Sequence, residues 1–350
     1  MNLSVENDVC GLISHIWGTD VPCKVHDVWT PDGYLLRLKR IKRDFNLSSK
    51  GIVLMYPGLG DTSATFVVSG RNESLAGLLF EQGYEIFLLD GRGRAPLIHK
   101  QFNANEKRFW EWSLDEKFEL DLPLLIQASM NISGENSVKG LIGHSQGALI
   151  ILAALAENKD IASIIKQAFL LAPPLSGWSP DYAYIPEGTF LQLENILPTN
   201  NLDEVFQSIR AVISRSCLIF PTVCSKITCL LSGCGSGSKF SESKLPEIFS
   251  FYPTASSFKN AEHLMKCERS AGLVHYREGR FLNFSKISIP LHFYFGTHDN
   301  LVDERRYMNG SMLFPNGTVK RFKILPFGHA DFVWGGNANE LIYSEILKNL

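Results

Sequence analysis

The chain has 350 residues, 45% of them hydrophobic, and a formal net charge of −2 at neutral pH. This length and composition are typical of a globular protein with a sizeable core, built as one large domain with an insertion or as two small domains. The near-neutral charge and the lack of a basic run argue against a nucleic-acid-binding protein.

The amino-terminal segment, MNLSVENDVCGLISHIW, has no basic start and no long apolar run, so no signal peptide is predicted there. Further along, residues 211–233 form the best candidate for a membrane span, but they include Arg215, Lys226 and several polar residues. A helix that crosses a bilayer needs about 18 or more uncharged apolar residues. We therefore expect no transmembrane segment and interpret residues 211–233 as an interfacial or cap segment.

A β-hairpin is predicted near the start of the chain, with strands at 24–30 and 34–41 joined by a Pro-Asp-Gly turn. Segments with helical spacing follow, for example at 74–82, 113–127 and 148–157. Between them lie six short apolar runs rich in β-branched or aromatic residues, at 51–56, 84–89, 138–142, 168–172, 290–295 and 321–325. Buried strands that alternate with helices predict an α/β fold with a mainly parallel central sheet and helices on both faces.

The stretch 174–285 interrupts this alternation, because it contains no clear strand–helix unit and includes a Gly/Ser-rich tract at 232–243. We predict that 174–285 is a helical cap or lid inserted into a core formed by residues 1–173 and 286–350. Ligands of open α/β sheets bind at the carboxyl edge of the sheet. The cap is therefore expected to lie over that edge.

A Gly-x-Ser-x-Gly motif lies at residues 143–147, around Ser145. Three fixed residues are a weak signal, but here the predicted strand 138–142 leads into the motif and the predicted helix 148–157 leaves it. That context is typical of the nucleophile elbow of the α/β-hydrolase fold, in which the serine hydroxyl is exposed at the top of the sheet. The alternative is a Gly-rich turn in which Ser145 is only the N-cap of the helix.

A serine nucleophile needs a base, usually a histidine oriented by a carboxylate, and in this fold the chain order is Ser, then acid, then His. Only His329 lies downstream of the last predicted strand, and Asp299 follows the strand before it. We predict Ser145, Asp299 and His329 as the catalytic triad, with Asp303 as the fallback acid.

Neighbouring residues are predicted to support this triad. Asp331 is expected to fix the base loop by hydrogen bonds, His144 to support the elbow, and His298 to point away from the site. An oxyanion hole needs two backbone donors. We predict these to be the N–H groups of Gln146 and of Leu59, the latter in the loop after the first parallel strand. The alternative for that loop is a plain Pro-Gly turn.

Two features favour the secretory pathway. Seven Asn-x-Ser/Thr sequons are present where roughly two or three are expected by chance, at Asn2, Asn46, Asn72, Asn131, Asn283, Asn309 and Asn316. Seven cysteines are present, four of them within 217–234, and the odd number leaves at least one unpaired if the others form disulfides. Their spacing does not fit a zinc site. The alternative is a cytosolic enzyme with reduced, buried thiols.

Taken together, these motifs resemble the acid lipase family of α/β-hydrolases, which includes gastric lipase, lysosomal acid lipase and related plant triacylglycerol lipases. The resemblance runs over nearly the whole chain and rests on the segments VPCKVHDVWTPDGYLLRLKRI, NESLAGLLFEQGYEIFLLDGRGR, FWEWSLDEKFELDLP, GHSQG, GTHDNLVD and PFGHADFVWG. It implies the same triad and oxyanion donors, a cap with a lid, and activity on triacylglycerols or cholesteryl esters.

The chain departs from the family pattern in two loops and in the cap. Residues 57–58 are Pro-Gly where the family usually has His-Gly, and residues 90–94 are DGRGR where it has Asn-Ser-Arg-Gly-Asn. The predicted oxyanion donors are backbone groups, so these changes alter the support of the loop rather than the donors. The cap matches only loosely, which leaves the substrate class the least defined part of the resemblance.

The family also implies two disulfides and a location. A family disulfide in the cap implies a bond between Cys224 and Cys234, and a plant-like spacing implies one between Cys10 and Cys23. The implied location is secreted or lysosomal/vacuolar, with a cytoplasmic or lipid-droplet location as the alternative.

The expected function is therefore serine-dependent hydrolysis of lipid carboxylic esters, either triacylglycerol or steryl ester, through an acyl-enzyme. The alternatives are a short-chain carboxylesterase or an acyltransferase on the same triad, or a lipid-binding relative without catalysis. No cofactor or metal motif is visible. The expected partners are a lipid ester substrate and, transiently, a lipid interface bound through the cap.

Overall fold

The computed structural model describes residues 9–175, 186, 188–196, 202–235, 240–302 and 314–350. Within these residues the centre of the fold is an eight-stranded sheet in the order β1-β2-β4-β3-β5-β6-β7-β8. The strands are β1 (Cys23–Trp29), β2 (Leu35–Ile41), β3 (Ile52–Tyr56), β4 (Glu85–Asp90), β5 (Val138–His144), β6 (Ala168–Leu171), β7 (Leu291–Gly296) and β8 (Val319–Leu325). Only the β1–β2 and β2–β4 pairs are antiparallel, so the sheet is mainly parallel, as predicted.

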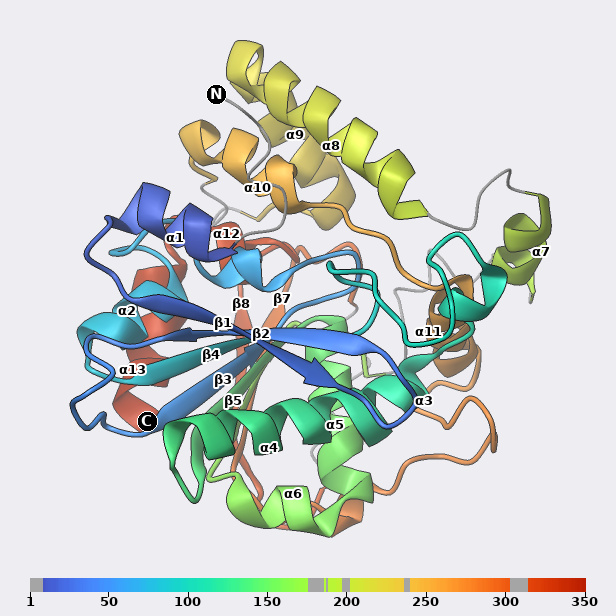
Figure 1. The fold of residues 1–350 in the computed structure, drawn as a ribbon, viewed down its shortest axis with the longest axis horizontal. Helices are drawn as coiled ribbons and strands as arrows, with labels where there is room; N and C mark the ends of the chain where they lie inside the picture. Colours follow the sequence, from blue (N-terminus) through green and yellow to red (C-terminus); the bar gives the residue numbers. More distant parts are fainter. Residues whose placement is uncertain (1–8, 176–185, 187, 197–201, 236–239, 303–313) are drawn as a thin grey trace.

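Helices lie on both faces of the sheet and beyond its ends (Figure 1). They are α1 (Val9–Trp17), α2 (Leu75–Glu81), α3 (Leu114–Glu116), α4 (Leu122–Ser133), α5 (Gln146–Glu157), α6 (Lys159–Ile164), α7 (Thr189–Ile196), α8 (Leu202–Ile219), α9 (Pro221–Ser232), α10 (Leu245–Phe251), α11 (Phe258–Arg269), α12 (Asp331–Trp334) and α13 (Ser344–Asn349). The α/β-hydrolase fold class predicted from the sequence is confirmed.

Side-chain caps fix several of these helix boundaries. Ser74 Oγ accepts a hydrogen bond from the Gly77 N–H at the start of α2, and Ser113 begins α3 with a capping box. The single helix predicted at 113–127 is divided in the structure, because a π-helical turn over Lys117–Asp121 separates α3 from α4. Gly134, with φ 77°, ends α4 in the left-handed conformation that glycine adopts without strain.

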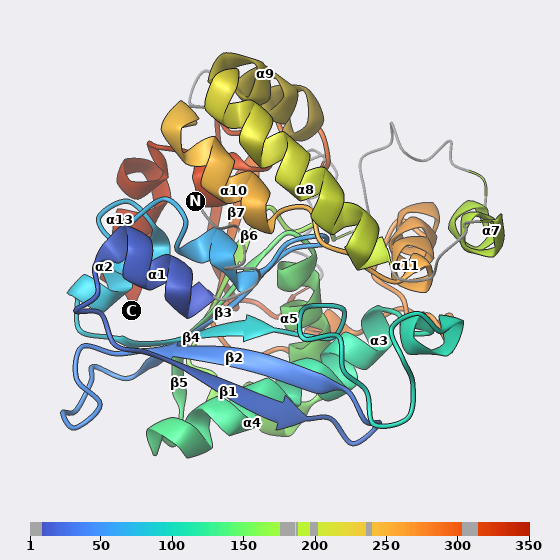
Figure 2. The ribbon, with the colours of Figure 1, turned by 45° about the horizontal axis from the view of Figure 1, so that its top comes forward.

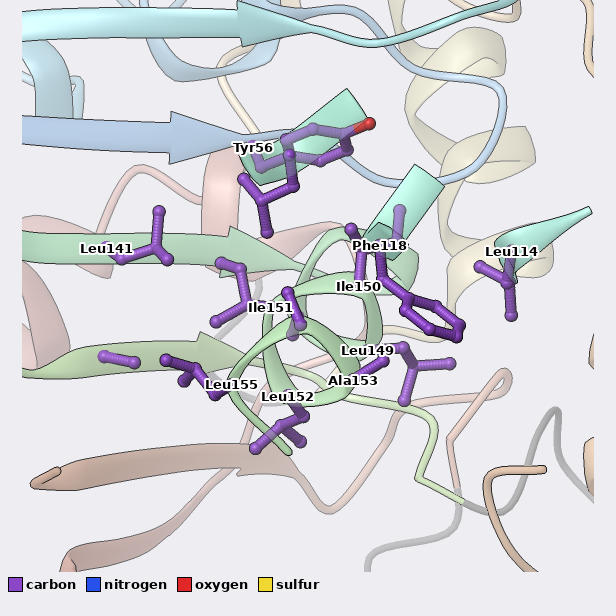
Figure 3. Packing of buried hydrophobic residues seen from close by; sticks show 14 of the residues in the cluster. Tyr56, Leu114, Phe118, Leu141, Leu149, Ile150, Ile151, Leu152, Ala153 and Leu155 are labelled. Atoms are coloured by element: carbon purple, nitrogen blue, oxygen red, sulfur yellow. The ribbon is translucent and has the colours of Figure 1, made fainter. Parts of the chain in front are cut away.

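The sheet separates two hydrophobic cores. Alternate residues of β3 point to opposite faces, so Leu54 belongs to one core while Val53 and Met55 belong to the other. The first core is built around α5, which is buried along nearly its whole length and packs between the sheet and Phe118 (Figure 3). A helix that is apolar on all sides is stable only when it is buried in this way. The helix that follows the serine is therefore a rigid support.

The described part of the insertion between β6 and β7 is helical and adds no strand to the sheet. Helices α8, α9 and α10 lie together beyond the strand ends, and α7 lies beside α11 (Figure 2). This arrangement agrees with the expected cap, although the division into a core of 1–173 and 286–350 and a cap of 174–285 remains a prediction.

Six cysteines form three disulfides, Cys10–Cys23, Cys217–Cys224 and Cys229–Cys234, and the remaining Cys267 is buried. The expected Cys10–Cys23 bond is confirmed, but the expected Cys224–Cys234 bond is wrong. Because α8 ends and α9 begins within a sharp corner, Cys217 lies next to Cys224, with their Cα atoms 5.6 Å apart. At the end of α9, Cys229 bonds to Cys234, so Cys234 is not the partner of Cys224.

A buried ion pair joins Arg92, just after β4, to Asp121 at the end of the π-helical turn. The Arg92 guanidinium, 1% exposed, donates hydrogen bonds to Asp121 at 2.8–2.9 Å and to Asp32 at 2.8 Å. We expect Asp121→Asn to lower the free energy of unfolding by about 3–5 kcal/mol, because the buried cation then loses its main anionic acceptor. Urea unfolding at neutral pH measures this change.

The matched control for this prediction is Asp27→Asn, which breaks the surface pair with Arg37. That pair is 43% and 27% exposed, so its loss should change the unfolding free energy by less than about 1 kcal/mol. Equal losses in the two variants would contradict the importance given to the buried pair.

Candidate active site

The predicted elbow is present between β5 and α5. Ser145 has φ 53° and ψ −124°, and its side chain makes no capping hydrogen bond to α5, unlike an ordinary N-cap serine. Only glycine fits at the two flanking positions, because neighbouring backbone atoms come too close for a Cβ. A Cβ at Gly147 would lie 2.3 Å from the Tyr56 carbonyl oxygen, and one at Gly143 would lie 2.7 Å from the Ala148 nitrogen. The backbone is thus held in a strained turn that presents Ser145 to a pocket.

The predicted acid and base meet through a hydrogen bond. Asp299 Oδ2 and His329 Nδ1 are 2.8 Å apart, and the two side chains are 1% and 8% exposed. Asp299 Oδ1 accepts from the N–H groups of Leu301 and Val302, which fixes the carboxylate. His329 lies in the loop between β8 and α12, and its ring lines the same pocket as Ser145. The fallback acid Asp303 lies outside the described residues.

The base loop is held on both sides. Asp331 Oδ2 accepts a hydrogen bond from the Gly328 N–H at 2.6 Å, as expected for a loop-fixing residue. On the other side His144 Nε2 lies 3.1 Å from the His329 carbonyl oxygen. Burial and the neighbouring His329 lower the pKa of His144 to about 3, so its ring is neutral near pH 7 and donates this bond from Nε2. His298 Nδ1 contacts Thr297 Oγ1 and does not join the pair.

The end of α9 also contacts the acid and base loops. The His329 N–H donates to the Ser232 carbonyl oxygen at 2.7 Å, and Asn300 Nδ2 donates to the Leu230 carbonyl oxygen at 3.2 Å. A Cβ at Gly328 would lie 1.9 Å from the Gly233 oxygen, so glycine is required at this approach. The helical insertion is therefore in direct contact with the loops that carry the predicted acid and base.

The predicted oxyanion donors lie beside the serine. Leu59 lines the pocket, and a Cβ at Gly58 would lie 3.1 Å from the Cβ of Ser145. No described residue accepts a hydrogen bond from the backbone N–H of Leu59 or of Gln146. The roles of both groups as oxyanion donors remain predictions.

These groups surround a pocket of about 220 Å³. Its wall is formed by Gly58, Leu59, Asp61, His144, Ser145, Leu231, Ser232, Tyr252, Leu301, His329, Ala330, Val333 and Trp334. In the part of the chain that the structure describes, no group of three His, Cys, Asp or Glu side chains is arranged to hold a metal ion. Nor is any described helix both long and apolar enough to cross a membrane.

Two charged residues of this region were missed by sequence reasoning, Asp61 and Arg94. Asp61 lines the pocket with 5% exposure, and Arg94, equally buried, donates to the Gly58 carbonyl oxygen at 3.1 Å. Asp61 stands in no motif. The one available signal was the departure from the family pattern at residues 90–94, where Arg94 replaces the family's asparagine.

The buried Asp61 leads to a prediction about pH. Burial raises the pKa of Asp61 to about 7, although hydrogen bonds from Thr65 and the Thr62 N–H act to lower it. The folded protein therefore keeps this proton to a higher pH than the unfolded chain, and its stability falls as the pH rises from about 4 to about 7. Asp61→Asn removes this penalty. We expect the free energy of unfolding of the variant, relative to that of wild type, to rise by up to about 4 kcal/mol between pH 4 and pH 8.

Urea unfolding of both proteins at the two pH values measures this gain. Other titrating groups, such as His144, are common to both proteins and cancel in the difference. A stability difference that is the same at pH 4 and at pH 8 would show that Asp61 does not titrate in this range.

Comparisons with known proteins agree with the fold. Residues 13–70 match the family described as "Partial alpha/beta-hydrolase lipase region". "Lipase lipl-1" of Caenorhabditis elegans is 28% identical over 95% of this chain and 88% of its own length. "Gastric triacylglycerol lipase" of Mus musculus is 26% identical over 99% of this chain and 92% of its own. A solved structure from Sulfolobus solfataricus has a TM-score of 0.68 at 14% identity, with 95% of each chain covered.

The fold and these relatives define the class of protein, a carboxylic ester hydrolase of the α/β-hydrolase fold. This is the class that the sequence predicts. Within that class, the predicted resemblance to the acid lipase family is confirmed, since the similarity to lipases extends over nearly the whole chain.

Proposed function

We propose that this protein hydrolyses lipid carboxylic esters, triacylglycerol or steryl esters, through an acyl-enzyme formed on Ser145. The observation that carries the proposal is the His329–Asp299 hydrogen bond, at 2.8 Å, in the wall of the pocket that the strained Ser145 also lines. Nucleophile, base and acid follow three different strands of one sheet and meet at its carboxyl edge, where α/β enzymes bind their ligands.

The proposed reaction uses these groups in turn. His329 Nε2 takes the proton of Ser145 Oγ as the oxygen attacks the ester carbonyl, and Asp299 holds the other ring nitrogen and stabilises the imidazolium. The N–H groups of Leu59 and Gln146 stabilise the oxyanion, each worth roughly 3–4 kcal/mol in transition-state energy. His329 then protonates the leaving alcohol and later activates a water molecule, which releases the fatty acid.

A lipid substrate is favoured by the surface around the pocket. The corner between α8 and α9 exposes Leu218, Ile219 and Phe220 by 60–70%, and the end of α9 exposes Leu230 by 76%. Leu231 is 60% exposed and also lines the pocket, so the apolar surface is continuous with the site. A pocket of about 220 Å³ is smaller than the ~300–1,000 Å³ typical of small-molecule sites. A long ester would therefore extend onto this surface, which we propose to bind the lipid interface.

A route through the secretory pathway is part of the same proposal. Three disulfides support it, since such bonds persist in oxidising compartments. Five sequons lie on described residues, and all five asparagines are exposed: Asn46, Asn72, Asn131, Asn283 and Asn316. Glycans on these residues would be compatible with the fold.

The substrate is tested with emulsified triolein, cholesteryl oleate and soluble p-nitrophenyl butyrate, at pH 5 and pH 8, with Ser145→Ala as the blank. Turnover of either long-chain ester supports the lipase proposal, whereas turnover of butyrate alone would reduce it to a short-chain esterase. No turnover, together with binding of the esters, would indicate a lipid-binding relative.

The interface is tested with the double variant Leu218→Ser/Leu230→Ser. It should lose activity on the triolein emulsion and keep its activity on soluble butyrate, because only the emulsion requires adsorption. The control is Leu47→Ser, which removes a comparably exposed leucine (64%) outside the helical insertion. Equal activity of the double variant and the control on the emulsion would count against an interface at α8 and α9.

A further inference from the structure

Arg94 is buried next to the site without an ion-pair partner among the described residues. Its guanidinium bonds to backbone carbonyls instead: Nη2 donates to Gly58 at 3.1 Å, and Nη1 donates to Ala255 at 2.9 Å and to Gly93 at 3.2 Å. Burying a cation without a paired carboxylate is costly. The bonds that Arg94 donates to these three carbonyls must therefore offset this cost.

The Gly58 carbonyl belongs to the same planar peptide group as the Leu59 N–H. In a trans peptide the oxygen and the hydrogen point in opposite directions, so a donor that holds the oxygen also sets the direction of the N–H. Arg94 holds the oxygen side of this peptide. On the other side, Leu59 lines the pocket and Gly58 lies against Ser145.

We propose that Arg94 is a positioning residue, which orients and polarises the Gly58–Leu59 peptide so that the Leu59 N–H can stabilise the oxyanion. The inference rests on the proposed function, because it assigns a support to the oxyanion hole of that reaction. A cationic donor on the carbonyl increases the donor strength of the N–H in the same peptide, since hydrogen bonds in a chain polarise one another. Arg94 does not touch the substrate in this scheme.

A purely structural role makes a different prediction. Through Ala255, Arg94 also holds the chain between α10 and α11, and its removal would loosen that connection. Arg210 provides a matched control. It is an equally buried arginine on α8, and Nη1 donates to the neighbouring Pro253 carbonyl at 2.8 Å without contacting Gly58. Arg210→Met therefore weakens the same chain segment and leaves the oxyanion peptide alone.

The experiment compares Arg94→Met, Arg94→Lys and Arg210→Met with wild type on p-nitrophenyl butyrate. For Arg94→Met we expect kcat to fall about 10–100-fold with KM within about threefold, because misplacing a transition-state donor affects the chemical step. Arg94→Lys should recover part of kcat, since it restores the charge. The affinity of a trifluoromethyl ketone, which forms an oxyanion with the serine, should fall by the same factor as kcat/KM. Arg210→Met should keep kcat within about twofold.

Several outcomes would overturn this inference. One is a kcat for Arg94→Met, or for Arg94→Lys if the first variant does not fold, that equals wild type. Another is an equal loss of kcat in Arg210→Met, or a loss confined to KM. An inactive wild type that a phosphonate does not label would instead overturn the proposed function itself, so the two failures are distinguishable.

Discussion

Ser145→Ala should abolish ester hydrolysis and leave the fold intact. We expect kcat to fall by about 10⁴–10⁶-fold, because the variant has no nucleophile to form the acyl-enzyme, and any residual rate comes from binding and the oxyanion hole. The thermal unfolding midpoint should stay near the wild-type value. Alanine and serine meet a similar strain at φ 53°, and the Ser145 side chain makes no capping bond that could be lost.

The measurement is the initial rate on p-nitrophenyl butyrate, combined with labelling by a fluorescent phosphonate. The control is Ser163→Ala on α6, an exposed serine whose hydroxyl bonds to the Asp160 carbonyl away from the pocket. Wild type and the control should be labelled and active. A Ser145→Ala protein with wild-type turnover would show that the nucleophile lies elsewhere.

Asp299→Asn should lower kcat by about 10⁴-fold, although it changes only one atom. The asparagine oxygen keeps the two bonds from the Leu301 and Val302 N–H groups, which leaves the amide NH₂ facing His329 Nδ1. To accept a hydrogen bond from this NH₂ group, Nδ1 of His329 must be unprotonated. The ring proton then moves to Nε2, so that His329 can no longer accept the proton of Ser145.

This variant is measured by kcat at neutral pH, with circular dichroism to confirm the fold. Asp27→Asn, at the exposed pair on β1, is the control and should retain full activity. A kcat within tenfold of wild type would remove Asp299 from the proposed triad. If Asp303→Asn alone then lost activity, the acid would be the fallback residue.

Much of the fold and the site follows from local sequence. Most strands are visible because they are short apolar runs bounded by turns. The elbow is visible because its tight turn requires glycine at 143 and 147, on either side of Ser145. The prediction of the acid and base follows from chain order, since parallel strands bring their carboxyl ends to one edge.

The parts that the sequence did not predict depend on long-range contacts. Cys224 bonds to Cys217 rather than Cys234 because of the corner between α8 and α9, which spacing alone does not reveal. Arg94 reaches Gly58 and Ala255, and the latter lies in the insertion, far away in the chain. Such bonds join backbone carbonyls, which every residue carries, so they leave no pattern of residue types.

The bond from the His329 N–H to the Ser232 carbonyl has a consequence for how this enzyme acquires activity. Along the chain Ser145 comes first, the insertion next, and the proposed acid and base last, so an incomplete chain carries the proposed nucleophile without its base. In the finished chain, the loop of the proposed base has this backbone bond only where the end of α9 is packed against it. Exchanging the insertion between relatives would therefore change specificity without loss of turnover only if residues 230–233 kept their place against the base.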